Sequence, residues 1–213
     1  MVRLLITRHG ETEYNIKGMF QGWQDSPLTE NGIINAKALG ARLKDDRIDA
    51  AYVSPARRTQ TTAEIVLGGR NVPIHVLEDL KELGFGKLEG TRFDKLEKTV
   101  GMKKAEFFDN LYTVAENAEK LYGGENIRDF ERRVLNALSG IIAENDGRTV
   151  LIVTHANPSL VMMRHFVKLT GGAAESVPRL FQTSLSEVIV NGDDVKVLKV
   201  GDTSHFVKNM KSH

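Results

Sequence analysis

The chain has 213 residues, of which 41% are hydrophobic, so it can build one sizeable core, and a single domain over residues 1–213 is expected. Its 29 basic and 28 acidic residues give a formal net charge of +1, which argues against a nucleic-acid or membrane partner. No cysteine is present, which excludes disulfides, thiol nucleophiles and zinc–thiolate sites. The apolar run at residues 2–6 is too short for a signal peptide, and no later segment could span a bilayer, so we expect a cytoplasmic protein.

The first predicted unit is a strand followed by a helix. Residues 2–7 form an apolar, β-rich run that suits a strand buried on both faces. Thr29 can cap a helix whose apolar positions continue to Leu43. Gly40 lies inside this helix and weakens it by about 1 kcal/mol relative to alanine. The apolar spacing still predicts a helix here.

The same pattern then repeats. Residues 50–53 predict a second strand, and Ser54-Pro55 the start of the next helix, with Ser54 as its N-cap. The glycine pair at 68–69 is expected to end that helix. Residues 74–77 are a third candidate strand.

Residues 87–122 are more charged than the rest, and the sequence favours a helical insertion or cap, broken at Gly101. After it, apolar residues at helical spacing predict a long amphipathic helix over 125–144. Residues 149–154 then predict a buried strand with a helix behind it, and 187–191 with 195–200 a β-hairpin. The end of the chain, residues 207–213, is expected to fray.

Alternating strands and helices predict an α/β fold: a three-layer sandwich with a mostly parallel central sheet, helices on both faces and a small helical insertion. Such sheets bind ligands beyond the carboxyl ends of their strands. His9, Ser54 and His155 each come directly after a predicted strand. We therefore expect these three side chains to share one crevice.

The residues around the two histidines suit an anion better than a metal. Arg8 precedes His9, and the pair Arg57-Arg58 opens the helix after the second strand. Guanidinium groups match phosphate oxygens in bidentate fashion and would repel a divalent cation. A metal held by His9 and His155 is the main alternative, and we expect no metal.

A phosphoryl-transfer site also needs a proton donor. Glu82 follows the third strand at the same edge of the sheet, but Glu78, Asp79 and Glu89 lie nearby, and each reads equally well as a surface carboxylate. The residues alone do not choose among these four.

Six segments in order along the chain resemble motifs of the histidine phosphatase superfamily, which includes phosphoglycerate mutases. The first is similar to its Arg-His-Gly signature, and the last to its second-histidine strand. The segments are TRHGETEYN, QGWQDSPLTENG, SPARRTQTTAEI, LKELGFGKLEG, YGGENIRDFERRV and VLIVTHAN. Six ordered matches are far more specific than one short motif.

The resemblance implies a role for each matching residue. His9 takes the place of the nucleophile and Glu82 that of the proton donor. The sequence departs from the family pattern at Thr61, Tyr122 and Ala156, and of these Ala156 could narrow the pocket. The other catalytic positions implied are Arg8, Arg58 and His155, and the substrate-binding positions are Asn15, Gln21, Gly22, Ala156 and Asn157.

The implied function is metal-independent hydrolysis of a small phosphorylated metabolite through a phosphohistidine, with an acidic pH optimum because Glu82 must be protonated. The alternative is a phosphoglycerate mutase, which would use 2,3-bisphosphoglycerate as cofactor; otherwise no cofactor is expected. A non-catalytic phosphate-ester binder is a third hypothesis, although it would have no use for the donor. A homodimer stays open.

Overall fold

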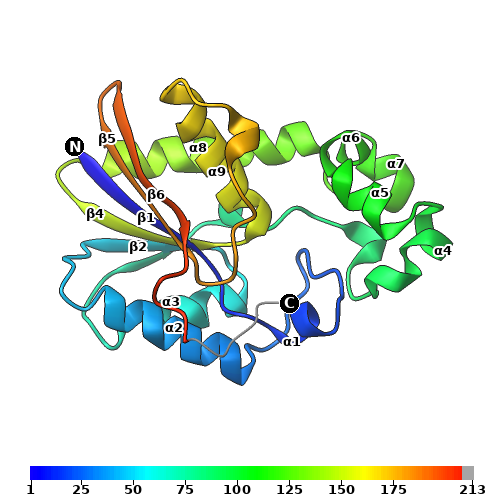
Figure 1. The fold of residues 1–213 in the computed structure, drawn as a ribbon. Coiled ribbons are helices and arrows are strands. Elements are labelled where there is room, and N and C mark those ends of the chain that lie inside the picture. The colour runs from blue at the N-terminus through cyan, green and yellow to red at the C-terminus, as the bar shows by residue number, and fades with distance from the viewer. Residues whose placement is uncertain (208–213) are drawn as a thin grey trace.

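The computed structural model describes residues 1–207, and its centre is one six-stranded sheet (Figure 1). The strand order is β3-β2-β4-β1-β5-β6. The first four of these run parallel, whereas β5 pairs antiparallel with both β1 and β6. The strands are β1 Val2–Arg8, β2 Ala50–Val53, β3 Ile74–Val76, β4 Thr149–Thr154, β5 Leu185–Asn191 and β6 Asp194–Asp202. The expected mostly parallel α/β sheet is confirmed.

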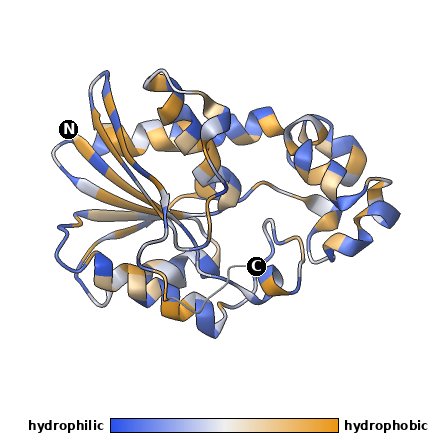
Figure 2. Ribbon diagram, viewed as in Figure 1, coloured by the Kyte–Doolittle hydropathy of each residue, from blue (hydrophilic) through white to orange (hydrophobic). Residues whose placement is uncertain are grey.

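Two pairs of helices cover the two faces of the sheet (Figure 1). The alternation of side chains along β1 divides the core, because Leu5 packs with one buried cluster and Leu4 and Ile6 with the other. Orange strands enclosed by helices with blue outer faces show the same layering in Figure 2. Helices α2 (Glu30–Arg42) and α3 (Arg57–Leu67) lie on the Leu5 face, and α8 (Ile127–Glu144) and α9 (Ala156–Leu169) on the opposite face.

The segment 87–122 is helical, as the sequence predicts, and forms a lobe beside the sheet (Figure 1). Gly101 ends the first helix of the lobe with φ 75°, a left-handed conformation that glycine adopts without strain. Phe107 and Tyr122 are fully buried and belong to the same cluster as Leu4 and Ile6. The lobe helices are α4 Leu96–Val100, α5 Lys104–Asp109, α6 Leu111–Ala115 and α7 Ala118–Tyr122; the short α1 is Glu13–Ile16.

Two local sequence signals in α2, the cap at Thr29 and the glycine at position 40, can be compared with the structure. Thr29 caps α2 by accepting a 3.0 Å hydrogen bond from the Gly32 amide, as predicted. A Cβ on Gly40 would lie 2.8 Å from the carbonyl oxygen of Val66 in α3. The glycine in the helix interior is therefore explained by the close packing of α2 on α3.

Three predicted boundaries were wrong. The N-cap of α3 is Ala56 and makes no side-chain cap, because the Ser54 hydroxyl is used in the functional site instead. Helix α8 begins at Ile127, with Asn126 as its cap, so Glu125 stands before the helix. The hairpin strands β5 and β6 are longer at both outer ends than the sequence indicated.

The expectation of fraying at 207–213 falls outside the described residues, apart from Val207. Among the helices within residues 1–207, none is both long enough and apolar enough to cross a bilayer.

Candidate active site

The site lies where the carboxyl ends of β1, β2 and β4 meet. The pairing of Arg8 with Thr154 aligns the ends of β1 and β4, and the amide of His9 donates to the Thr154 carbonyl at 2.9 Å. The rings of His9 and His155 therefore meet edge to face, with centroids 5.3 Å apart. The sheet brings together the two histidines that the sequence places at two strand ends.

The ring of His9 is held as a neutral imidazole. Its Nδ1 lies 2.7 Å from the Gly10 carbonyl oxygen, and because a carbonyl only accepts, Nδ1 carries the proton. Nε2 is left with a free lone pair. Burial, and then the charges of Arg58 and Arg8, lower the pKa of His9 well below its usual range.

The ring of His155 has the opposite tautomer. Arg58 Nη2 lies 3.0 Å from His155 Nδ1, and since a guanidinium only donates, Nδ1 must accept. The proton therefore sits on Nε2, which donates to the Ser54 hydroxyl at 2.7 Å. Burial, and then the Arg58 charge, lower the pKa of His155 well below its usual range.

Two buried arginines differ in how many of their N–H donors are used: Arg58 uses four of its five, and Arg8 uses one. Arg58 donates through its Nη atoms to His155, to the carbonyls of Gly22 and Gln24 and to Asp25, while Arg8 Nη1 donates to the Leu180 carbonyl.

Among residues 1–207, the Nε atoms of both Arg8 and Arg58 are buried and have no partner. An unpaired buried N–H is costly, and an anion would satisfy both. Burial lowers the pKa of Arg8 to about 10, against the opposing charge of Glu82, and burial also lowers the pKa of Arg58. A guanidinium is so strong a base that it stays protonated in proteins. The pair is suited to a phosphoryl group.

The carboxylate of Glu82 is fixed from the start of α9. It accepts the amide of Ala156 at 3.1 Å and both the amide and the side-chain Nδ2 of Asn157, at 3.3 and 3.0 Å. Glu82 is 8% exposed, whereas Glu78 and Asp79 are exposed on the surface. Ala156 and Asn157, expected to bind substrate, therefore use these donors to orient the acid.

Three other positions expected to bind substrate contribute to the loop between β1 and α2. Asn15 Oδ1 accepts from Thr12 in a capping box, and the Gln21 amide is engaged by Thr12 and Ser26. Gly22 offers its carbonyl to Arg58 at 2.8 Å. In this structure Gln21 has a scaffolding role, and Gly22 acts through its backbone.

Two acidic residues to which the sequence gives no functional role, Asp25 and Glu89, order this loop. Asp25 pairs with Arg58 at 3.1 Å. Glu89, taken for a surface carboxylate, accepts the amides of Trp23, Gln24 and Phe85 at 2.9–3.2 Å. A Cβ on Gly22 would lie 2.2 Å from Glu89 Oε1, so the glycine leaves room for this carboxylate. The one sequence feature that points to this role of Glu89 is its place in LKELGFGKLEG, the segment that also carries Glu82.

A second missed group is the ion pair of Glu125 with Arg133, which staples the loop that carries Glu82. Arg133 uses all five of its N–H donors: two bind Glu125, at 2.7 and 2.8 Å, and three bind the carbonyls of Asp79, Lys81 and Glu82, at 2.8–2.9 Å. Glu125 also accepts the Gly84 amide. The Gly-Gly-Glu motif marks Glu125, but no local pattern identifies Arg133.

We expect Arg133→Lys to destabilise the protein by about 3 kcal/mol, because one partner of a largely buried pair loses its fork of donors. For a chain of this size the melting temperature should fall by about 6–12 °C. Turnover of alkyl phosphates should fall with it, since Glu82 loses its support. The control is Arg132→Lys, because Arg132 is 69% exposed and, in the part of the chain that the structure describes, pairs only with Asp129. Equal melting temperatures for the two variants would contradict this assignment.

A pocket of about 320 Å³ opens beside these groups and is lined by Gly22, Ser54, Arg58, Glu82 and His155 among others. His9 and Arg8 adjoin the pocket without lining it. Within residues 1–207 no three acidic or histidine side chains are grouped as metal ligands.

The site combines a buried neutral imidazole, two buried guanidiniums with free donors and an oriented carboxylate, at one edge of a mostly parallel sheet. This combination is that of a phosphoryl-transfer enzyme. The chain belongs to the histidine phosphatase superfamily, branch 1, whose family model matches residues 4–203.

Both phosphatases and phosphoglycerate mutases are similar to this chain. An adenosylcobalamin/alpha-ribazole phosphatase of Salmonella typhimurium is 38% identical over 72% of this chain and 74% of its own length. A 2,3-bisphosphoglycerate-dependent phosphoglycerate mutase of Cytophaga hutchinsonii is 31% identical over 94% and 95%. Among solved structures, Bacillus stearothermophilus YhfR has a TM-score of 0.83 and 36% identity, covering 97% of this chain and 100% of its own.

Proposed function

We propose that the protein is a metal-independent phosphomonoester hydrolase that acts on a small phosphorylated metabolite through a phosphohistidine. The observation that carries the proposal is the neutral His9 ring, which feels the charges of Arg58 and Arg8. Within residues 1–207 each of these arginines has a buried Nε–H without a partner. A phosphoryl group would bind both donors and face the nucleophile.

In the first step His9 Nε2 attacks phosphorus in line, the N–P bond forms and the ester P–O bond breaks. The electron pair leaves on the ester oxygen, which takes a proton from Glu82. In the second step Glu82 takes a proton from water, and the resulting hydroxide attacks the phosphohistidine, releasing phosphate and restoring His9. Arg8 and Arg58 stabilise the charge on the equatorial oxygens in both steps.

The residues around the loop that carries Glu82 favour hydrolysis over mutase activity. Mutases that the sequence resembles carry a tyrosine three residues after the donor, where this chain has Phe85, 6% exposed and packed 5.2 Å from the Phe20 ring. The only basic pair of the insertion, Lys103-Lys104, is exposed and lies outside the pocket lining. Asn157 resembles the asparagine that the mutases carry shortly after the second histidine, and here it donates to Glu82. Relatives with phosphatase and mutase names match about equally well.

The test follows 3-phosphoglycerate with and without 2,3-bisphosphoglycerate, measuring released phosphate and, through enolase, 2-phosphoglycerate. We expect phosphate release, little 2-phosphoglycerate and no change on adding a chelator, because arginines supply the positive charge. Rapid conversion that depends on the bisphosphate, with little phosphate released, would identify a mutase. Activity that is lost with chelator and restored by a divalent ion would overturn the metal-free mechanism.

A further inference from the structure

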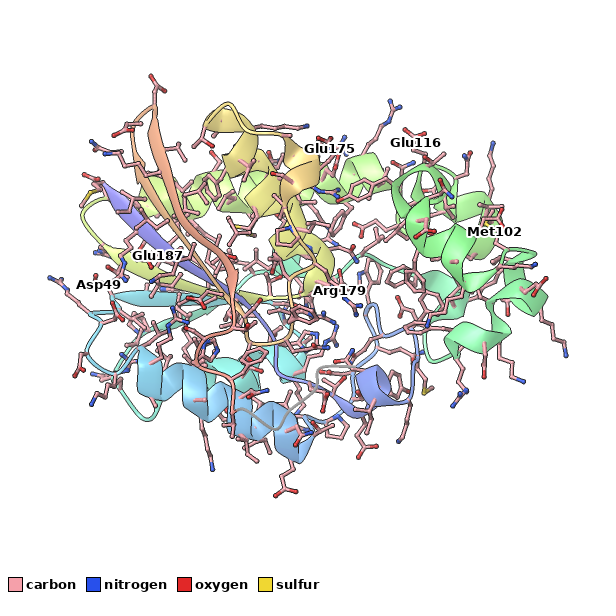
Figure 3. All side chains as sticks on the ribbon, viewed as in Figure 1. Asp49, Met102, Glu116, Glu175, Arg179 and Glu187 are labelled. Atoms are coloured by element: carbon pink, nitrogen blue, oxygen red, sulfur yellow. The ribbon has the colours of Figure 1, made fainter. Side chains whose placement is uncertain are left out.

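A short segment between α9 and β5, residues 180–184, holds Arg8 in two places, and we call it the strap. The Leu180 carbonyl accepts from Arg8 Nη1 at 3.3 Å, and the Thr183 amide donates to the Arg8 carbonyl at 3.0 Å. Figure 3 labels Arg179, the residue directly before the strap, between the sheet and the lobe of α4 to α7. The strap thus fixes both the backbone and the side chain of an arginine of the candidate active site.

The Arg8 carbonyl belongs to the peptide group that joins Arg8 to His9. The N–H of this group, on His9, donates to the Thr154 carbonyl of β4 at 2.9 Å, while its C=O accepts from Thr183. A peptide group is planar, so bonds at both of its ends fix its orientation and, with it, the two Cα atoms. The strap and β4 together therefore set the position of Arg8 relative to His9.

Thr183 makes its contact with Arg8 in a strained conformation. Its φ is 57°, and no other non-glycine residue within residues 1–207 has a positive φ. This conformation is unfavourable for a β-branched residue and persists only where the surroundings hold it. Thr183 is fully buried, so its N–H and its C=O both need partners inside the protein.

The partner of the Thr183 carbonyl is His205, which follows β6. Its Nε2 donates to this carbonyl at 2.9 Å. Arg42 of α2 donates from Nη1 to His205 Nδ1 at 3.0 Å, and since a guanidinium only donates, the ring carries its proton on Nε2. Arg42 is itself held by Asp202 and Ser204. The tautomer of His205 is therefore fixed as the one that donates to Thr183.

We propose that Thr183 and His205 are positioning residues of the phosphoryl-transfer site: the bond from His205 keeps Thr183 in its strained conformation, in which the Thr183 amide holds the peptide group between Arg8 and His9. Without this bond the buried Thr183 carbonyl has no partner, and the residue can relax to a negative φ, which turns its N–H away from the Arg8 carbonyl. The inference rests on the proposed function for what Arg8 and His9 bind. It assigns two residues that act through Arg8 and not on the substrate.

The test measures the binding of inorganic phosphate by calorimetry, which needs no turnover, at a temperature at which every variant is folded. His205→Ala should weaken phosphate binding about tenfold, because a buried carbonyl loses its donor and Arg8 is no longer held in place. His205→Gln should restore most of the affinity, since its amide nitrogen can donate to the Thr183 carbonyl. With alkyl phosphates, kcat/KM should follow the same order.

Thr183→Gly separates the role of the strap from a general effect on stability. Glycine adopts φ 57° without strain, so in this background His205→Ala should weaken phosphate binding by less than about threefold. The control is His165→Ala on α9, which should bind phosphate as the wild type does. His165 and His205 are both half-buried, and each ring packs against the phenylalanine that follows it.

Unchanged phosphate binding in His205→Ala, or the same loss with and without Thr183→Gly, would overturn the role of the strap. If phosphate binding follows the expected order but the wild type hydrolyses no ester, the proposed function fails and this inference stands.

Discussion

His9→Ala should lower turnover of every phosphomonoester by at least about a thousandfold, because removing a nucleophile removes the covalent route entirely. The Nδ1–H bond to the Gly10 carbonyl leaves Nε2 unprotonated, and the charges of Arg58 and Arg8 act on this ring. Rapid quench of the wild type with labelled substrate should trap a phosphoenzyme that is labile in acid and stable in base.

His75→Ala is the control for the loss of a histidine as such, since His75 is exposed on the edge strand β3. It should keep wild-type turnover and the trapped adduct. If His9→Ala still formed the same adduct, or kept full turnover, the nucleophile would lie elsewhere, and the neutral tautomer of His9 would have no role in catalysis.

Glu82→Gln has the second largest expected effect, a loss of about a hundred- to ten-thousandfold on alkyl phosphates. Their leaving oxygen needs the proton that an amide cannot supply. With p-nitrophenyl phosphate the loss should be much smaller, because nitrophenolate leaves without protonation. The ratio of the two losses is the measurement to make, by steady-state kinetics on both substrates.

The ratio also separates chemistry from structure. The new amide nitrogen would face an N–H of Ala156 or Asn157, and this donor–donor contact would lower both rates alike. Asp79→Asn, on an exposed side chain outside the pocket lining, should change neither rate. Equal losses for Glu82→Gln on the two substrates would assign Glu82 to binding or structure.

The sequence predicts those parts of the site that depend on local order. Parallel strands deliver their carboxyl ends to one edge, so His9 and His155 could be placed together from the strand pattern alone. The family motifs then separate Glu82 from its three neighbouring acids, and the structure places Glu82, Arg8 and Arg58 beside the two histidines.

What the sequence could not show depends on contacts between distant residues. Arg133 binds carbonyls more than fifty residues away, and carbonyls are present at every position, so nothing in the sequence marks the ones it meets. Ser54 was assigned to a helix cap because its local signal is that of a cap, but the hydroxyl meets His155, 101 residues away, at 2.7 Å. Here a tertiary contact overrides local preference.

The position of β1 in the sheet has a consequence for the life of the chain on the ribosome. Strand β1, which leads into His9, is made before the other five strands of the sheet, yet both its neighbours, β4 and β5, begin only at residues 149 and 185. At ordinary rates of translation, β1 waits roughly 7–30 seconds with both edges unpaired before β4 is made. Pairing across so much chain is slow. The nascent chain should therefore depend on chaperones that cover β1, and the sheet around β1 is complete only once β5 has left the exit tunnel.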